Sequence, residues 1–385
     1  MNTQTVQCNT QKQVNLDKLS NLSKIKGKFD VVFDNLDGKI LNKRYKVQKF
    51  LDNGQNGEVY EVTDIKKDGR PLVIKVQETT DLFLEEINSM IKVQRKCKSN
   101  GGNTAKANGR TPEIKDYGQF ILIDSANVQK DAATLDLTDD NAVIFSYMVM
   151  PRYGMTLHDL FESRKGLLSA ASIYSLGIQM INILEQIHQA GFVFNDLKLD
   201  NLLFDMDADA KKLRTTEENI FDKNNINIID FGFVCPYVDQ DTQEHLEKTQ
   251  LDIFRGNMVF SSINQLKFHS TSRRDDLISL FYLLVYLFKR GNLPGTTVPA
   301  DTDVNDEFKI IRDAKINQST KDVCFGNTKD LTSFKREVFG YRFKDEPKYE
   351  HLRQMLRELR DKETAKAQAR ALEGTSLQSR LEICI

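Results

Sequence analysis

Cysteine is scarce in this 385-residue sequence, and no cysteine pair has the spacing of a metal site. The five cysteines are scattered along the chain at Cys8, Cys97, Cys235, Cys324 and Cys384. An odd number of isolated cysteines, without a C-x-x-C pair or a Cys/His cluster, argues against a disulfide-stapled secreted domain and against a zinc module. We therefore expect reduced thiols in an intracellular protein. The expected location is cytoplasmic, with a cytoskeletal or nuclear location left open.

Net charge and long apolar runs are also missing. Lysine and arginine number 54 against 55 acidic residues, giving a net charge of -1, unlike the basic surface of a dedicated nucleic-acid-binding protein. The N-terminal residues lack the apolar segment of a secretory signal. The longest apolar run, at 277–288, spans 12 residues, which is typical of a buried core helix and too short to cross a membrane. We expect no nucleic-acid partner and no membrane span.

The sequence does contain a strand-rich first part and a helix-rich second part. β-branched and aromatic residues at 46–50, 58–63 and 72–76 predict three strands, and apolar residues at helical spacing over 81–96 predict a helix after them. Beyond residue 172 the pattern is mainly helical. This order predicts an α+β protein with two lobes, a small β-rich N-lobe with one main helix and a large, mainly helical C-lobe.

Composition divides the chain into segments. A polar N-terminal extension is expected at 1–42, the folded domain at 43–361 (N-lobe about 43–150, C-lobe about 155–361), and a C-terminal tail at 362–385. Stretches rich in Gly, Asn, Asp and Lys at 99–110, 125–141 and 205–225 are predicted to be surface insertions. The tail begins as a charged, Ala-rich helical segment. We expect it to pack back on the C-lobe, with homodimerisation as the alternative.

Two features of the N-lobe are typical of a phosphate site. The first is a loop at 51–60 in which Gly54 and Gly57 allow backbone amides to approach phosphate oxygens. Alone, this loop is more typical of an ordinary hairpin. The second is Lys75 on a strand with Glu86 on the next helix, because a lysine held by a carboxylate can bind nucleotide phosphates. The competing interpretation of that pair is a surface ion pair.

The C-lobe supplies a more specific combination. Asp196, Lys198 and Asn201 form the pattern D-x-K-x-x-N, and Asp230 begins a D-F-G sequence. Together they provide a carboxylate that orients a hydroxyl group, a lysine for the γ-phosphate, and two oxygen ligands for Mg²⁺. The four elements occur in the order found in protein kinases, so chance is a poor explanation.

The chain therefore resembles a eukaryotic protein kinase, and within that superfamily it is similar to the casein kinase I family. The family-level resemblance rests on S-S-I-N at 261–264, S-R-R-D-D at 272–276 and the segments at 290–294 and 343–354. It covers about 45–359. It implies ATP and Mg²⁺ as cofactors and a protein as substrate.

The resemblance also implies a role for each matching residue. Asp196 would orient the substrate hydroxyl and Lys198 would neutralise the transferring phosphoryl group, while Asn201 and Asp230 would hold Mg²⁺. Asp276 would fix the backbone of the catalytic loop. The implied nucleotide-binding residues are Leu51, Gly54, Gly57, Val59, Val73, Lys75, Glu86, Met150 and Leu203, with Met150 as gatekeeper and Tyr153 in a hinge at 151–154.

Several positions depart from the family pattern. Asp52 replaces the first glycine of the loop, and its charge is expected to weaken ATP binding. Asn195 replaces the arginine that reads a phosphorylated activation loop, so we expect no need for that phosphorylation. Asn257 stands where a Thr is expected, and Val259 stands where an Arg would bind phosphate on a primed substrate. The segment 234–264 carries five acidic residues, so acidic peptides are expected to be poor substrates.

Two classes of function remain at this point. The leading one is a Ser/Thr protein kinase with altered substrate preference. The alternative is a weakly active or inactive kinase-like scaffold in a larger assembly, held through the tails or insertions. A dinucleotide-binding domain is disfavoured because Gly57 leads into a strand and not into a helix. No role is assigned to His158, His188, His245, His269 or His351, which lack partners at ligand spacing.

Overall fold

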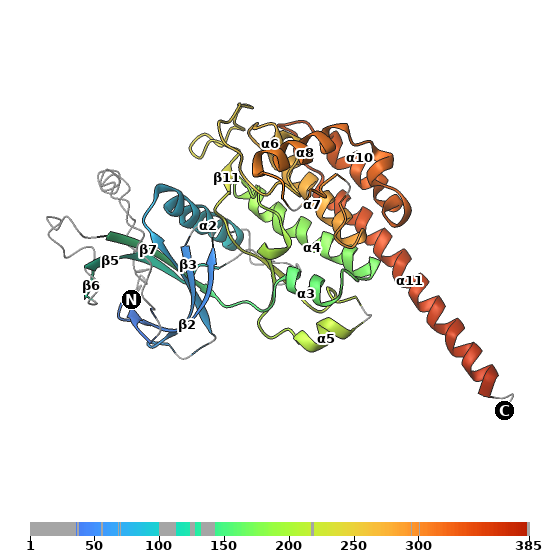
Figure 1. Ribbon diagram of the computed structural model, residues 1–385, viewed down its shortest axis with the longest axis horizontal. Coiled ribbons are helices and arrows are strands. Elements are labelled where there is room, and N and C mark those ends of the chain that lie inside the picture. Colours follow the sequence, from blue (N-terminus) through green and yellow to red (C-terminus); the bar gives the residue numbers. More distant parts are fainter. Residues whose placement is uncertain are drawn as a thin grey trace, which may run out of the picture.

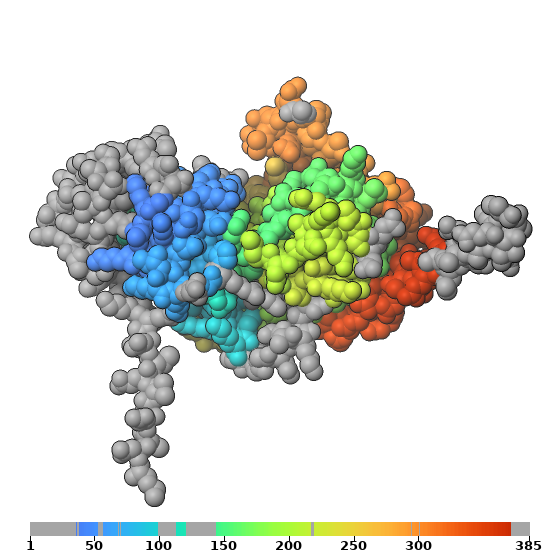
Figure 2. Space-filling model, turned by 90° about the horizontal axis from the view of Figure 1, so that it is seen from below, coloured from blue at the N-terminus to red at the C-terminus, as the bar shows by residue number. Residues whose placement is uncertain are grey.

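The structure, a computed structural model, describes residues 36, 38–54, 57–67, 69, 71–99, 113–123, 128–131, 143–216, 219–293, 295–299 and 301–382. It has the predicted bilobal α+β fold, with a β-sheet and one helix in the N-lobe and a mainly helical C-lobe (Figure 1). In the space-filling view the blue N-lobe adjoins the green and yellow part of the C-lobe (Figure 2).

The N-lobe is a seven-stranded sheet with the strand order β1-β2-β3-β4-β7-β5-β6, and every pairing in it is antiparallel. Its strands are β1 (Ile40–Leu41), β2 (Tyr45–Gly54), β3 (Gly57–Asp64), β4 (Leu72–Glu78), β5 (Asp116–Ile123), β6 (Val128–Asp131) and β7 (Val143–Pro151). The predicted three-strand meander is confirmed as β2, β3 and β4. Helix α2 (Asp81–Ser99) follows, and its apolar residues Phe83, Ile87 and Met90 pack into the main core.

The sheet begins before the expected domain boundary at residue 43. Ile40 pairs with Lys46 across β1 and β2. Both Leu36 and Leu41 are buried in the hydrophobic cluster formed by side chains of the N-lobe strands. The folded domain therefore includes the end of the segment that was expected to be an extension. The rest of that segment, and the expected insertion at 99–110 apart from Ser99, lie outside the described residues.

Two buried helices form the centre of the C-lobe, α4 (Ala170–Gln189) and α7 (Arg273–Phe288). The run 277–288 lies in α7 and is buried except at Tyr286, which confirms the predicted core helix. Gly177 of α4 allows helix α11 (Tyr349–Glu382) to pack closely against α4, because a Cβ at this position would lie 2.7 Å from a methyl group of Leu356. Among the described residues no helix combines the length and apolar character needed to span a bilayer.

The remaining elements surround this centre. They are α3 (Leu157–Ser163), α5 (Ala210–Thr215), α6 (Ile263–Leu266), α8 (Val304–Asn317), α9 (Thr320–Val323), α10 (Thr332–Gly340), α11 (Tyr349–Glu382) and the 3-10 helices η3 (Leu199–Asn201) and η4 (Gly326–Leu331). Two small ladders pair β8 (Phe192–Val193) with β11 (Cys235–Pro236), and β9 (Leu202–Phe204) with β10 (Ile226–Ile228). These ladders hold the loops that follow β8 and β10 beside the N-lobe.

Two expectations about the C-lobe periphery need correction. The stretch at 205–225 is not only a surface insertion, because Leu213, Ile220 and Phe221 are buried in the main core. The tail does not fold back on the C-lobe: α11 continues without a break from Tyr349 to Glu382 and projects beyond the lobe (Figure 1). Within the tail, Lys362 still reaches the C-lobe through an ion pair of 3.1 Å with Asp330.

Candidate active site

Lys75 and Glu86 form a buried ion pair in the N-lobe. Both carboxylate oxygens of Glu86 lie 2.9 Å from the Lys75 Nζ atom, and the two residues are 9% and 4% exposed. Burial alone would lower the pKa of Lys75, but the carboxylates of Glu86 and Asp230 outweigh it and raise that pKa, so the lysine stays charged. The alternative of a solvent-exposed surface pair is therefore wrong.

Asp230 brings the C-lobe to this ion pair. Its Oδ1 atom lies 3.6 Å from the Lys75 Nζ atom, and its φ of 62° turns the side chain back toward the N-lobe. The next residue, Phe231, is buried edge-on against Phe194 with ring centroids 5.5 Å apart, and its backbone N–H donates to Glu86. The D-F-G sequence thus joins both lobes at one point.

Asp196 is 1% exposed and lies at the centre of the catalytic loop. Its Oδ2 atom lies 2.9 Å from the Lys198 Nζ atom and 3.0 Å from the Asn201 Nδ2 atom, which also donates to the Asp196 carbonyl at 2.9 Å. These donors stabilise the ionised carboxylate. They also fix the direction in which it can accept another proton donor.

Asn257 supplies a further donor to Asp196 despite departing from the family pattern. Its Nδ2 atom donates to the Asp196 Oδ1 atom at 3.3 Å and to the Leu197 carbonyl at 2.9 Å, and its own Oδ1 atom accepts from the backbone N–H of Phe260 at 2.8 Å. The amide therefore ties the segment before α6 to the catalytic loop. A hydroxyl group is not required for this contact.

A buried network under the catalytic loop fixes its backbone. The carboxylate of Asp276 accepts the backbone N–H groups of Phe194 and Asn195 at 2.7 and 2.8 Å, as the resemblance implied. His188 lies between Asp276 and Tyr349, with ring nitrogens 2.8 Å from the Asp276 Oδ2 atom and 2.7 Å from the Tyr349 hydroxyl. His188 was assigned no role, which is wrong. The available signal was a polar residue four positions after Leu184 on an apolar helix face.

Asn195 anchors the segment that follows the D-F-G sequence. Its Nδ2 atom donates to the Phe233 carbonyl at 3.0 Å and contacts the Cys235 Sγ atom at 3.2 Å. Its φ is 69°, in the left-handed region that Asn tolerates better than most residues. A neutral amide thus makes a direct contact to this segment.

The predicted nucleotide-binding residues lie on β2, β3, β4, α2, β7 and β9 and in the linker after β7. Val73 and Met150 are paired across β4 and β7, and Leu51 lies at a register shift of β2. The structure leaves Leu51, Val59, Val73, Tyr153 and Leu203 half-buried and Met150 nearly buried. Half-buried apolar residues from both lobes are suited to a flat aromatic ring.

The glycines have distinct structural reasons. Gly57 has a φ of 123°, and a Cβ there would lie 2.6 Å from the Val76 carbonyl, so only glycine fits. Gly54 is its partner at the end of the β2–β3 hairpin. In the linker between lobes, Gly154 donates to the Phe204 carbonyl at 2.8 Å. Asp52 is exposed and lies opposite Val59, so its charge faces solvent near the hairpin end.

The residues predicted to hold Mg²⁺ fit that ion. Because Asn201 donates through its nitrogen to Asp196, its amide oxygen is left as an acceptor, and Asp230 is one-third exposed at its side chain. Amide and carboxylate oxygens are the donors that Mg²⁺ prefers, and one or two protein ligands are typical where phosphates complete the shell. The described residues contain no larger cluster of acidic, His or Cys side chains suited to a metal.

Comparison with known protein families agrees with this geometry. Residues 125–361, more than half of the chain, match the family described as the protein kinase domain. The match contains Asp196, Lys198, Asn201 and Asp230, whereas Lys75 and Glu86 precede it and are joined to it by the contacts above. Members of this family are phosphotransferases that generally use ATP and Mg²⁺. The chain belongs to the protein kinase domain family.

Proposed function

We propose that the protein is a serine/threonine protein kinase resembling the casein kinase I family, which transfers the γ-phosphate of ATP to Ser and Thr hydroxyls of proteins. The observation that carries this proposal is the continuous set of contacts from Glu86 through Lys75 to Asp230, together with an Asp196 carboxylate held by Lys198 and Asn201. A scaffold without catalysis would not require both lobes to converge on these charges.

The catalytic loop provides the groups for proton and charge transfer. Asp196 accepts the hydrogen bond of the substrate hydroxyl and orients it for attack. Lys198, which is half-buried beside Asp196, neutralises charge on the transferring phosphoryl group. Asn201 and Asp230 would hold Mg²⁺ through side-chain oxygens. The bound metal supplies charge neutralisation at the phosphates.

The N-lobe and the linker bind the nucleotide. Lys75, positioned by Glu86, binds the α- and β-phosphates, and the backbone at Gly54 and Gly57 covers them. The side chains that enclose the adenine are those of Leu51, Val59, Val73, Met150, Tyr153 and Leu203. Asp52 lowers the affinity for ATP through like-charge repulsion.

The amide contacts of Asn195 support activity without phosphorylation of the activation loop. In the structure Asn195 holds the Phe233 carbonyl directly, a neutral contact that does not depend on an added phosphate. Treatment with a phosphatase is therefore expected to leave the rate of phosphate transfer unchanged. We place the protein in the cytoplasm, acting on protein substrates.

The deciding experiment is Mg²⁺-dependent transfer of labelled γ-phosphate to a panel of Ser, Thr and Tyr peptides with acidic, neutral or basic flanks. The native chain is compared with Asp196→Asn and with the surface variant Lys321→Met as a control. We expect transfer to Ser and Thr peptides by the native chain and the control, lost in Asp196→Asn. Absence of transfer by a folded native chain refutes the kinase proposal and favours the scaffold; transfer to Tyr peptides alone refutes the Ser/Thr assignment.

A further inference from the structure

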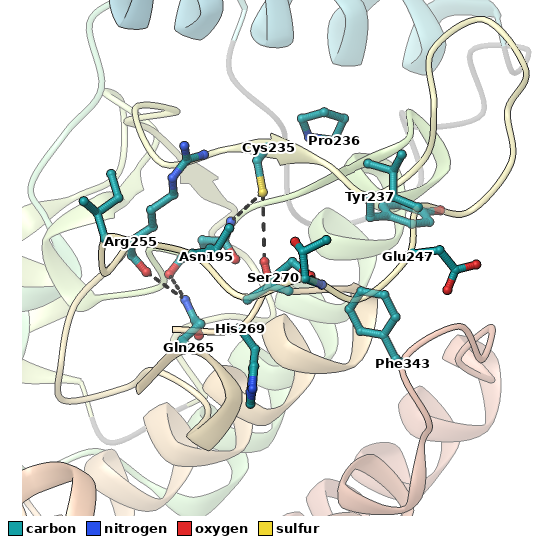
Figure 3. A pocket seen from close by; sticks show the side chains of 15 residues that line it. Asn195, Cys235, Pro236, Tyr237, Glu247, Arg255, Gln265, His269, Ser270 and Phe343 are labelled. Atoms are coloured by element: carbon teal, nitrogen blue, oxygen red, sulfur yellow. Dashed lines mark hydrogen bonds between the residues drawn. The ribbon is translucent and has the colours of Figure 1, made fainter. Parts of the chain in front are cut away.

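A cavity of about 380 Å³ lies beside the catalytic loop and is separate from the nucleotide site. Its walls come from the catalytic loop, the segment 235–255, the loop after α6 and the loop before α11 (Figure 3). The volume is within the range of sites that take a small ligand or a large side chain. None of the roles proposed above uses it.

The walls of the cavity are mainly apolar. Among the described lining residues, the aliphatic and aromatic ones are Pro236, Tyr237, Leu246, Leu251, Ile253 and Phe343. One cationic residue, Arg255, and one anionic residue, Glu247, lie at opposite ends in Figure 3, and Glu247 is paired with Lys344. The lining therefore favours an apolar occupant over a strongly charged one.

The mouth of the cavity exposes two large aliphatic side chains. Leu246 is 39% exposed and Ile253 is 61% exposed, and both line the cavity. Neighbouring exposed apolar groups beside a cavity are typical of a surface that becomes covered on binding. The acidic residue Asp252 between Leu251 and Ile253 is also exposed, which disfavours an acidic occupant.

The cavity is continuous with the catalytic loop. Asn195, which precedes Asp196, forms part of its wall, and Gln265 donates to the carbonyls of Asn195 and Arg255 at 3.0 and 3.2 Å. Gly256 allows its own segment to lie close to the catalytic loop, because a Cβ there would lie 2.4 Å from the Asn195 carbonyl oxygen. An occupant of the cavity thus lies against the backbone that carries Asp196.

We propose that this cavity is a specificity subsite that takes a bulky aliphatic or aromatic side chain of the protein substrate, at a position near the phosphorylated residue. The proposal rests on the kinase function proposed above and names the class of substrate. Because Asn195 lines the cavity and directly precedes Asp196, a substrate whose side chain fills the cavity places its hydroxyl at Asp196. Acidic side chains gain little there because the lining is mainly apolar and the exposed Asp252 lies between two lining residues.

The test uses peptides with a fixed Ser and with Leu, Ala or Asp placed in turn at each position on either side of it. For the native chain we expect one position at which Leu exceeds Ala by about tenfold in kcat/KM, the lower end of what a hydrophobic pocket gives. The change is expected mainly in KM, because the anchor binds ground state and transition state alike. Ile253→Ala should reduce the Leu-to-Ala ratio to about one third of its native value or less.

The matched control is Val304→Ala on α8, which removes a side chain that is 66% exposed and outside the cavity lining. This variant should keep the native ratio. An equal Leu-to-Ala ratio in the native chain and in Ile253→Ala overturns the subsite. So does a preference for Asp at the selected position.

Binding separates failure of the subsite from failure of the kinase function. Fluorescent Leu and Ala peptides are titrated against Asp196→Asn, which lacks the proposed base but retains the cavity. Tighter binding of the Leu peptide, lost on adding Ile253→Ala, supports the subsite even if the native chain transfers no phosphate. Equal binding of both peptides overturns it, and so does light scattering that shows a dimer lost in Ile253→Ala, because a second copy then covers the cavity.

Discussion

The substitution Lys315→Met tests how a buried lysine shapes the stability of the C-lobe. Lys315 on α8 is 1% exposed, and its Nζ atom lies 2.7 Å from the Ser261 carbonyl, 3.4 Å from the Met258 carbonyl and 4.2 Å from the ring centre of Tyr282. No carboxylate pairs with it within the part of the chain that the structure describes. Methionine has similar length and no charge.

Burial lowers the pKa of Lys315 well below its ordinary value of 10.5. Between the folded pKa and 10.5 the unfolded chain holds a proton that the folded chain lacks, so stability rises with pH. The slope from this one group is about 1.4 kcal/mol per pH unit. This contribution is lost as the pH falls toward the folded pKa.

Two opposing effects set the result for Lys315→Met. Loss of the hydrogen bonds removes the lysine donor from the buried Ser261 carbonyl and from the half-buried Met258 carbonyl, which costs about 1 to 3 kcal/mol for each one that water cannot reach. Loss of the titrating amine removes the slope. The deficit of the variant relative to the native chain should therefore grow with pH. Between about pH 9 and about pH 7 it should shrink by up to about 2.7 kcal/mol.

Urea denaturation of the native chain and of Lys315→Met, between about pH 7 and about pH 9, measures the difference in their free energies of unfolding. The control is Lys321→Met, which replaces an exposed lysine of α9. The control curve should stay parallel to the native curve. Parallel curves for the native chain and Lys315→Met would refute the reasoning, because Lys315 would then titrate alike in the folded and unfolded states.

Substitutions at three further positions test the active site. Lys75→Met should lower phosphate transfer by about two orders of magnitude or more and lower the urea midpoint, because Glu86 is left buried and unpaired; a fluorescent ATP analogue should show the matching loss of nucleotide affinity. Asp276→Asn should lower kcat about tenfold or more with little change in KM for ATP, since it weakens charge-assisted bonds to the catalytic-loop backbone; an unchanged kcat contradicts this role. Asn257→Ala should reduce kcat about tenfold by removing a donor to Asp196. In the same assay, Asn257→Thr should keep more of the native kcat than Asn257→Gln.

Much of the fold and of the predicted site could be read from the sequence because the deciding groups are close together along the chain. One loop and one turn of 3-10 helix contain Asp196, Lys198 and Asn201, so their spacing in the sequence already places the three side chains in contact. Lys75 and Glu86 lie on a strand and the helix that follows it, which is the simplest arrangement for a buried pair. Their functional roles remain predictions until transfer is measured.

The remaining features depend on contacts that sequence spacing does not encode. His188 and Tyr349 are 161 positions apart, and Lys315 meets carbonyls more than 50 positions away. The segment 205–225 was expected at the surface because its polar composition conceals Leu213 and Phe221, each of which is buried by the fold as a whole. The change to Asn257 looked like a loss at the level of residue type, whereas its amide makes the contact to Asp196.

The hydrogen bond between His188 and Tyr349 has a consequence for biosynthesis. Tyr349 begins α11, so the support beneath the catalytic loop is incomplete until this late residue has been made. At about 5 to 20 residues per second, the ribosome completes the motif around Asp196 roughly eight to thirty seconds before it adds Tyr349. During that interval the nascent chain carries its motif residues and Asp276 without the Tyr349 hydroxyl that holds His188 beneath the catalytic loop.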